Sequence, residues 1–268
     1  MKFDLHTHHY RCAHAPGQIR DYIEAAIDKG LHAIGISDHA PYFCDEADHA
    51  QPAIAMAKSE FPHYINEVLA LKKQYEPRIE VLLGVESVYF PEHIDYYKTI
   101  YSQYPLDYII GSVHHSNGTS IFDRNRWSNL TAAEIVAEKE QYFNLIKQSF
   151  LSGAFDILGH IDALAGFFPQ LHEYATPAVD DTLRVIGEHA GVIEVNTSGK
   201  NKLCGGWHPA DELLERAHYF GVQVTFGSDA HVTDRVGDEW DEVSARLKQI
   251  GFTKWTLFQQ RQRCEYAL

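Results

Sequence analysis

Phe3-Asp4-Leu5-His6-Thr7-His8 is a short, largely apolar run that passes directly into two histidines one residue apart. Alternate residues of an extended chain point to the same side, so both imidazoles can turn toward one pocket where a strand ends. A helical pattern follows over residues 19–27, and Gly30 supplies its stop signal. The order of strand, polar strand end and helix indicates a βα unit.

The same unit recurs along the chain. Six further strand candidates alternate with helical patterns, which are clearest at 59–75, 131–151 and 209–220, and these strands are expected at 33–36, 81–83, 108–110, 157–158, 192–195 and 222–226. Seven strands alternating with helices indicate a parallel sheet with the helices outside. No glycine-rich nucleotide loop follows any strand, and a length of 268 residues suits one barrel. We therefore predict an α/β fold, a distorted TIM-like barrel of seven βα units, with residues 1–268 in a single domain.

Nearly every predicted strand ends in a side chain that can bind a metal ion. These residues are His6 and His8, Asp38 and His39, Glu86, His114, His160 and Asp162, Asn196, and Asp229 and His231. In an α/β barrel the carboxyl ends of the strands converge on one face, where active sites are built. A single histidine after a strand is more often a hydrogen-bonded structural residue. The whole ordered set, in a chain with 17 histidines, predicts a site with more than one metal ion.

The composition limits the classes of function. A formal net charge of −14 argues against a track for nucleic-acid phosphates and favours a small substrate. No stretch reaches the roughly 20 apolar residues of a membrane helix, and the first residues lack the pattern of a secretory signal. We therefore expect a cytoplasmic protein without nucleic-acid or membrane partners, whose four scattered cysteines stay reduced. The oligomeric state is left open.

The ordered strand-end motifs resemble the polymerase-and-histidinol-phosphatase (PHP) superfamily. They are Asp4-Leu5-His6-Thr7-His8, Ser37-Asp38-His39-Ala40-Pro41, Gly84-Val85-Glu86, Gly111-Ser112-Val113-His114-His115, Leu158-Gly159-His160-Ile161-Asp162 and Gly227-Ser228-Asp229-Ala230-His231. The segment Cys12-Ala13-His14-Ala15 and the chain length are similar to the histidinol-phosphatase branch. The resemblance implies the distorted PHP-type barrel. It also implies metal-dependent hydrolysis of L-histidinol phosphate to L-histidinol and inorganic phosphate, a late step in histidine biosynthesis.

The resemblance further implies two to three divalent ions of zinc, iron or manganese, held by residues of these motifs. One ion would be bound by His6, His8, Glu86 and Asp229, a second by Glu86, His114 and His160, and a third by His14, His39 and His231. Imidazole nitrogens and carboxylate oxygens suit these metals. Glu86 and Asp229 are the predicted catalytic carboxylates, and Asp229 or His231 would deliver a proton to the leaving alkoxide. Asp38 and Asp162 are expected to orient neighbouring histidines.

Contacts to the substrate are predicted from positions near the strand ends. Lys200 and Lys202 follow the sixth strand closely and are the preferred phosphate clamp. Arg124 and Arg126, in the loop after the fourth strand, are the rival clamp. His115 and Asn196 lie beside predicted strand ends and are further candidates for substrate binding.

Three other functions are weighed against this hypothesis. A PHP-type phosphoesterase or nuclease would act on nucleotides or other phosphate esters, but the acidic charge and the lack of a basic, aromatic strand disfavour it. An amidohydrolase also begins with two such histidines, yet it favours a bridging lysine where this chain has Glu86. A metal-buffering protein needs a closed ligand set, and a metal sensor needs an effector domain; the pattern indicates neither.

Overall fold

The computed structural model describes residues 1–268 and contains one seven-stranded parallel sheet. In spatial order its strands are β1 (Phe3–Asp4), β2 (Ala33–Ile36), β3 (Glu80–Val88), β4 (Tyr108–Ser112), β7 (Ile157–Leu158), β8 (Val192–Asn196) and β9 (Gln223–Gly227). The chain order and the spatial order agree, so each strand pairs with the next one of the sheet. All seven predicted strands are present. Two short strands, β5 (His115–Ser116) and β6 (Thr119–Ser120), form a small hairpin after β4.

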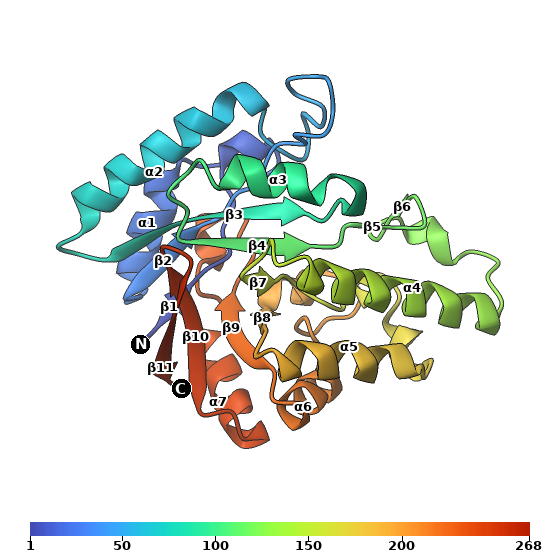
Figure 1. Ribbon diagram of the computed structural model, residues 1–268. Helices are drawn as coiled ribbons and strands as arrows, with labels where there is room; N and C mark the ends of the chain where they lie inside the picture. Colours follow the sequence, from blue (N-terminus) through green and yellow to red (C-terminus); the bar gives the residue numbers. More distant parts are fainter.

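The sheet curves until its first and last strands meet. The backbone N–H of Leu5 donates to the carbonyl oxygen of Phe226 at 3.1 Å, and that of His8 donates to Ala230 at 2.9 Å. The two strands are joined by isolated bonds of this kind, including the bridge between Thr7 and Ala230, and by no continuous ladder. The result is a nearly closed barrel (Figure 1), which confirms the predicted distorted TIM-like fold.

Seven α-helices lie outside the strands (Figure 1). They are α1 (Ile19–Asp28), α2 (Phe61–Tyr75), α3 (Ile94–Tyr101), α4 (Ala132–Leu151), α5 (Pro177–Glu188), α6 (Asp211–Tyr219) and α7 (Trp240–Ile250). Local sequence explains where α4 begins, because Thr131 accepts from the backbone of Glu134 while the Glu134 carboxylate reaches back to Thr131. None of the helices combines the length and the apolar character that crossing a membrane requires.

Tyr108 fills part of the barrel interior. Its hydroxyl donates to the carbonyl oxygen of Leu5 at 2.5 Å, so the ring reaches from β4 to the chain just past β1. This position is free only because Gly35 on β2 and Gly84 on β3 have no side chains. A Cβ atom on either glycine would overlap the Tyr108 side chain. The interior is therefore packed on the amino side of the ligand-bearing strand ends.

The chain ends in a hairpin that the sequence analysis did not predict, formed by β10 (Lys254–Gln259) and β11 (Gln262–Ala267). Its Trp255 packs edge-on against Phe3 with ring centroids 5.4 Å apart, so the hairpin covers the start of β1. The turn residues Gln260 and Arg261 both have positive φ, at 49° and 63°. Asn and Gly normally mark such turns, and their absence removed the sequence signal.

Candidate metal centre and pocket

Glu86, near the end of β3, lies among three histidines from other strand ends. Its Oε1 atom is 3.3 Å from Nε2 of His114 and 3.0 Å from Nε2 of His160. Its Oε2 atom is 2.6 Å from Nδ1 of His39. Ser112 donates a further hydrogen bond to Oε1 at 2.7 Å. The ends of β2, β3, β4 and β7 therefore meet at one buried carboxylate, as the barrel predicts.

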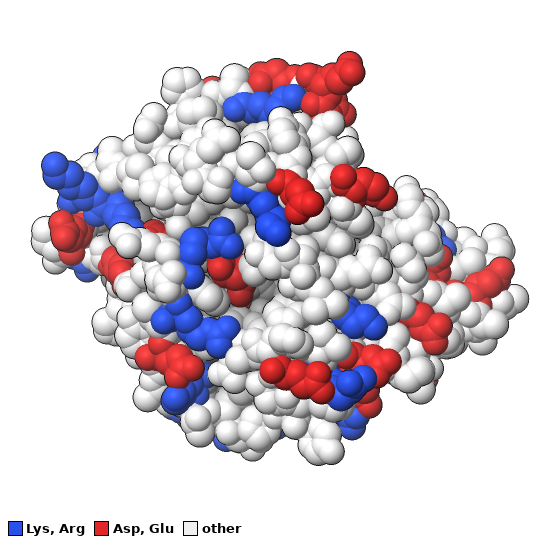
Figure 2. All heavy atoms as spheres, viewed as in Figure 1, with Lys and Arg blue, Asp and Glu red and all other residues white.

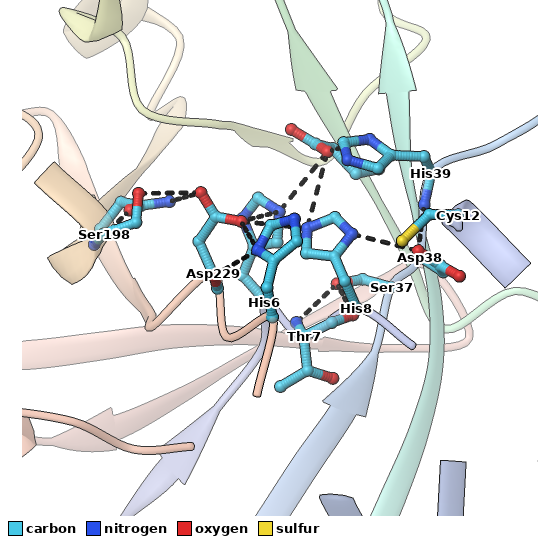
Figure 3. A network of polar contacts seen from close by, with 12 residues as sticks. His6, Thr7, His8, Cys12, Ser37, Asp38, His39, Ser198 and Asp229 are labelled. Carbon is cyan, nitrogen blue, oxygen red and sulfur yellow. Dashed lines mark hydrogen bonds and ion pairs between the residues drawn. The ribbon is translucent and has the colours of Figure 1, made fainter. Parts of the chain in front are cut away.

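A second group joins the first strand end to the last one (Figure 3). Nε2 of His8 is 3.0 Å from Oδ1 of Asp229. Nε2 of His6 lies 3.7 Å from that same oxygen and 3.7 Å from Oε2 of Glu86. The closure of the barrel thus brings together residues more than 200 positions apart in the sequence.

His14 and His231 form the outer part of the cluster. Their Nε2 atoms face each other at 3.0 Å. The Nδ1 atom of His231 lies 2.9 Å from the carbonyl oxygen of Asp229. The Nδ1 atom of His14 lies 2.9 Å from the carbonyl oxygen of Cys12. An Nδ1–H bond to a carbonyl leaves the lone pair on Nε2, so both rings present an acceptor nitrogen to the same small space.

Two buried carboxylates orient the first histidines. Oε1 of Glu194 lies 2.6 Å from Nδ1 of His6, and Oδ1 of Asp38 lies 3.1 Å from Nδ1 of His8. Asp38 was predicted to orient the neighbouring His39. In the structure its side chain contacts the ring of His8 instead. Carboxylates that accept from Nδ1 leave Nε2 free for a metal.

Glu194 was missed by the sequence analysis. The sequence feature that could have revealed it is an acidic residue inside the apolar run 192–195. In the structure Glu194 is 1% exposed. Gly227 on β9 makes the room for it, because a Cβ atom there would overlap both Glu194 and His6.

The second predicted orienting acid has another partner. Asp162 was expected to support His160, but its Oδ1 lies 2.6 Å from Nδ1 of His208. Oδ2 of Asp162 accepts from the backbone N–H of Ala210 at 2.8 Å, so the segment 208–210 binds both oxygens of this carboxylate. His160 has a positive φ of 22°. Asp229 also has a positive φ, of 53°. Left-handed backbone at two such residues costs about 1–3 kcal/mol each and is typical of functional sites.

The carboxylates and histidines perturb each other's protonation. Burial raises the pKa of Glu86, but the surrounding histidines, His39 first, outweigh it and hold the pKa well below its usual value. Asp229 has a depressed pKa through His6 and His8 in the same way. Burial lowers the pKa of His8, but bonds to Asp229 and Asp38 raise it to about 9.

The pKa values of His114 and His231 change in the opposite direction to that of His8. Burial lowers the pKa of His114 to about 4, and burial together with the nearby His8 lowers that of His231 to about 3. Both side chains are therefore neutral near pH 7, which is the form of imidazole that binds metals.

The groups open into a pocket of 650 Å³. His14, His39, Glu86, His114, His160, Asp229 and His231 line it. Four apolar side chains, Ile54, Phe122, Phe167 and Val232, form part of its wall. Lys202 and Arg235 supply its positive charges. Arg235 was not among the predicted substrate residues, because it follows β9 by several residues and carried no motif.

The other predicted substrate contacts lie in different places. Lys202 lines the pocket, with Nζ 3.4 Å from Oγ of Ser198. Lys200 lies in a neighbouring pocket and forms an ion pair with Glu239. The two side chains diverge because Lys200 belongs to the 3₁₀-helix Thr197–Asn201, whereas Lys202 continues in extended backbone.

The remaining candidates, Arg126 among them, do not line the pocket. Asn196 is buried and donates to Oε2 of Glu194 at 2.9 Å, so it supports a carboxylate. His115 is exposed on the small hairpin β5–β6. The guanidinium of Arg124 stacks 4.6 Å from the ring of Phe167, and Arg124 is exposed to solvent beside that pocket residue.

The donor atoms fit metal ions. Four groups each hold ligand atoms within 4.8 Å of one another: His6, His8 and Glu86; Glu86, His114 and His160; His8, His39 and His231; and His8, Cys12 and Asp38. Nε2 of His6 is buried without a hydrogen-bond partner. Nε2 of His8 and Oε2 of Glu86 are also buried and lie close to Asp229 and His39, but without the alignment of a hydrogen bond. Buried polar atoms are rarely left unpaired, so these three atoms fit a cation that they would bind.

Comparison with known proteins agrees with this geometry. The PHP domain family matches residues 4–198. A probable histidinol-phosphatase of Deinococcus radiodurans is 30% identical over 260 residues, which cover 92% of this chain and 93% of the relative. The histidinol-phosphatase of Bacillus subtilis is 32% identical and covers 88% of this chain and 96% of its own.

Solved structures share the fold. The histidinol phosphate phosphatase of Lactococcus lactis, in complex with zinc, L-histidinol and phosphate, superimposes with a TM-score of 0.78 at 18% identity and covers 98% of both chains. A putative histidinol phosphatase from Listeria monocytogenes has a TM-score of 0.76 at 22% identity and covers 90% of this chain and 99% of its own. With a family match over most of its length and two relatives at or above 30% identity, this chain belongs to the PHP domain family, in its histidinol-phosphatase branch.

Proposed function

We propose that this protein hydrolyses L-histidinol phosphate to L-histidinol and inorganic phosphate with the help of two to three divalent ions of zinc, iron or manganese. One observation carries the proposal. Nitrogen and oxygen ligands from five strand ends and from His14 line one pocket that also holds Lys202 and Arg235. His6 and His8, from a sixth strand end, adjoin its carboxylates Glu86 and Asp229. Two proteins that are similar to this chain over most of its length are named histidinol-phosphatase or probable histidinol-phosphatase. We also infer action in the cytoplasm, on a small phosphate monoester, by one domain.

The proposed ligand sets extend the clusters. His6, His8 and Glu86, with Asp229 beside His8, would hold one ion, and Glu86, His114 and His160 would hold a second. His14, His39 and His231 would hold a third; the observed cluster has His8 in the place of His14, and His14 is included because its Nε2 lies 3.0 Å from that of His231. Such ions supply Lewis acidity toward phosphoryl oxygens and activate water near neutral pH. Glu194 and Asp38 fix the rings of His6 and His8, so that the Nε2 atoms keep their direction.

Other side chains would bind the substrate. Lys202 and Arg235 can pair with the phosphate, because they are the two cations that line the pocket. Phe122 and Phe167 offer apolar surface for the imidazole end of histidinol. His231 or Asp229 would pass a proton from water to the leaving alkoxide, because their lowered pKa values leave neither group with a proton of its own near pH 7. The hydroxyl of Ser198 holds the carboxylate of Asp229 at 2.9 Å.

Metal removal tests the proposal. We expect chelation to abolish hydrolysis of histidinol phosphate and stoichiometric metal to restore it. Glu86→Ala and His114→Ala should each lower kcat at least about a hundredfold, since even residues that only orient metal ligands are worth about 10–100-fold. His63→Ala is the matched control, because His63 is exposed on α2. Full activity in a verified metal-free sample contradicts the proposal.

Substrate comparison separates the competing functions. Histidinol phosphate should have a much higher kcat/KM than nucleotides or phosphate diesters, because its imidazole and amine add binding energy remote from the phosphate. Figure 2 shows lysine and arginine side chains interspersed with aspartate and glutamate side chains over one face of the molecule. A higher kcat/KM for a single-stranded oligonucleotide would favour the nuclease function instead.

A further inference from the structure

A second pocket, of 490 Å³, lies next to the metal centre and has no part in the proposed hydrolysis. The segment 198–206 contributes to both pockets. Ser198 and Lys202 line the first one, whereas Lys200 and Cys204 line the second. Whatever binds in the second pocket therefore contacts the same short segment that reaches the phosphate site.

In the second pocket a cysteine contacts a histidine, and the same histidine contacts an aspartate. The thiol of Cys204, which is partly exposed, lies 4.0 Å from Nε2 of His208. That distance is the outer limit for a hydrogen bond to sulfur, and the thiol is the one hydrogen-bond partner of Nε2. Nδ1 of His208 lies 2.6 Å from Oδ1 of Asp162. Both His208 and Asp162 are buried, at 1% and 3% exposure, although they reach the pocket wall.

The imidazole of His208 is held rigidly toward the thiol. The backbone of His208 pairs in both directions with that of Asn196 at the end of β8, at 2.6 and 2.8 Å. Asp162 is anchored by the backbone N–H of Ala210 at 2.8 Å. A Cβ atom on Gly199 would lie 3.0 Å from the His208 ring, so the chain packs closely over it. The arrangement is preorganised and does not depend on a flexible side chain.

The electrostatics favour a thiolate. Burial lowers the pKa of His208, but the Asp162 carboxylate outweighs this effect and raises it to about 9. Burial raises the pKa of the Cys204 thiol, but the hydrogen bond to His208 and the backbone of Gly206 lower it more. An imidazolium beside a thiol is the arrangement that gives reactive cysteines.

Other charged and titratable groups face the pocket but largely offset one another. They are His172, Lys200, Asp211, Glu239, Glu242 and Arg246. Lys200 pairs with Glu239, and Arg246 pairs with Asp211 at 2.8 Å. Lys202 adds a positive charge near His208 from the first pocket. His208 is therefore the titratable group in contact with the Cys204 thiol.

We propose that Cys204 is a reactive thiol that exchanges with low-molecular-weight disulfides, and that the adduct slows turnover in the neighbouring metal pocket. The Cys204 thiolate attacks one sulfur of the disulfide, a new S–S bond forms, and the old S–S bond breaks. The displaced thiolate leaves and takes a proton from water, so the exchange needs no further oxidant.

The adduct acts through the shared segment. The sulfur of Cys204 lies 3.3 Å from the carbonyl oxygen of Gly199, to which the protonated thiol donates, and a mixed disulfide adds a bulky group to that sulfur. Gly199 follows Ser198, which holds the Asp229 carboxylate. A displaced segment therefore disturbs Ser198 and Lys202 together.

The first experiment measures the alkylation rate of each cysteine of the native protein with limiting iodoacetamide, by peptide mass spectrometry from pH 5.5 to 9. Cys264 and Cys44 are internal controls, since both are partly exposed and neither contacts a histidine. At pH 6.5 Cys204 should react about fivefold faster than Cys264, because a larger thiolate fraction outweighs a lower intrinsic nucleophilicity. Below pH 7 its rate should fall less steeply with pH than that of Cys264.

His208→Gln should remove this advantage, because glutamine carries no positive charge. The buried Cys12 reports on folding in this variant, since unfolding would also raise its labelling. A Cys204 that reacts no faster than Cys264, or that keeps its rate in a folded His208→Gln variant, overturns the reactive-thiol proposal.

The second experiment measures turnover and metal content with oxidised glutathione. We expect hydrolysis by the native protein to slow at least threefold and to recover with a thiol reductant, at constant metal content. Cys204→Ser should be unaffected by the disulfide. Equal slowing of the native protein and Cys204→Ser, or no slowing of either, overturns the link to turnover.

Discussion

Glu194 shows how a single buried acid organises the metal centre. Its carboxylate contacts Nδ1 of His6 and accepts from the backbone N–H of His160 at 3.1 Å and from Asn196. It therefore orients one proposed ligand directly and positions a second through its backbone. Its negative charge also raises the basicity of the His6 ring.

We expect Glu194→Gln to weaken metal affinity about 10–100-fold, since the amide keeps the shape but loses the charge that orients His6. Competition with a chelator measures the affinity, and kcat at saturating metal measures the remaining activity. Glu188→Gln is the matched control because Glu188 is exposed at the end of α5. Unchanged metal affinity in Glu194→Gln would show that the His6 ring is oriented by other contacts.

The two lysines of the segment after β8 now have different expected effects. Lys202 lines the metal pocket, whereas Lys200 is paired with Glu239 outside it. A charge that contacts the phosphate in both the ground state and the transition state contributes mainly to KM. We predict that Lys202→Ala raises KM for histidinol phosphate about tenfold with metal content unchanged, and that Lys200→Ala leaves KM within about twofold. Steady-state kinetics of both variants decide this, and the reverse order would place the clamp at Lys200.

At the scale of elements, the barrel depends on close contact between β2, β3 and β4. Tyr108 on β4 takes the space above Gly35 and Gly84, and its hydroxyl ties it to Leu5. Glu86 stands two residues after Gly84 on the same strand. The packing of Tyr108 against these glycines therefore determines where the Glu86 carboxylate of β3 lies.

We expect Gly84→Ala to lower the free energy of unfolding by about 1–3 kcal/mol, because the added Cβ would lie within 2.3–2.8 Å of the Tyr108 ring. Urea denaturation measures the change. Gly206→Ala serves as the control, since the nearest atom to its Cβ would be 3.9 Å away. Equal stability of the two variants would mean that Tyr108 moves aside at no cost.

At the scale of the whole molecule, titration of the metal-free site should lower the stability of the fold at both high and low pH. His8 has a raised folded-state pKa, of about 9, so its contribution to stability is complete below the unfolded value of 6.5 and is lost as pH rises toward 9. His114 and His231 have lowered pKa values, so stability is lost as pH falls below 6.5. Glu86 and Asp229 have depressed pKa values, and their contribution is lost as pH falls below the unfolded values of 4.5 and 3.8.

The Tm of the metal-free protein should therefore peak near about pH 6 and fall by at least about 3 °C on either side. Circular dichroism of chelator-treated protein from pH 4 to 9 measures it. Added metal should raise Tm most above pH 7, since a metal ion takes the place of the proton on the ligand nitrogens. A steady rise in the Tm of the metal-free protein from pH 6 to 9 would contradict the roles given to these groups.

The sequence alone determined the barrel and the positions of its potential ligands. Strand ends can be identified locally, by an apolar run that stops at His6, Glu86 or Asp229. In a parallel barrel all such ends point to one face, so chain direction alone predicts that these side chains approach each other. The ends of β1, β3 and β9 do meet there.

Only the tertiary structure decided which atoms contact which. The pair of His6 and Glu194 joins residues 188 positions apart and depends on the space above Gly227, which no local pattern reveals. Arg235 lies at the pocket and Lys200 does not, because the direction of a loop side chain follows from the backbone after the strand. Local pattern specifies where a strand ends, whereas contacts across the barrel follow from its closure and the packing of its interior.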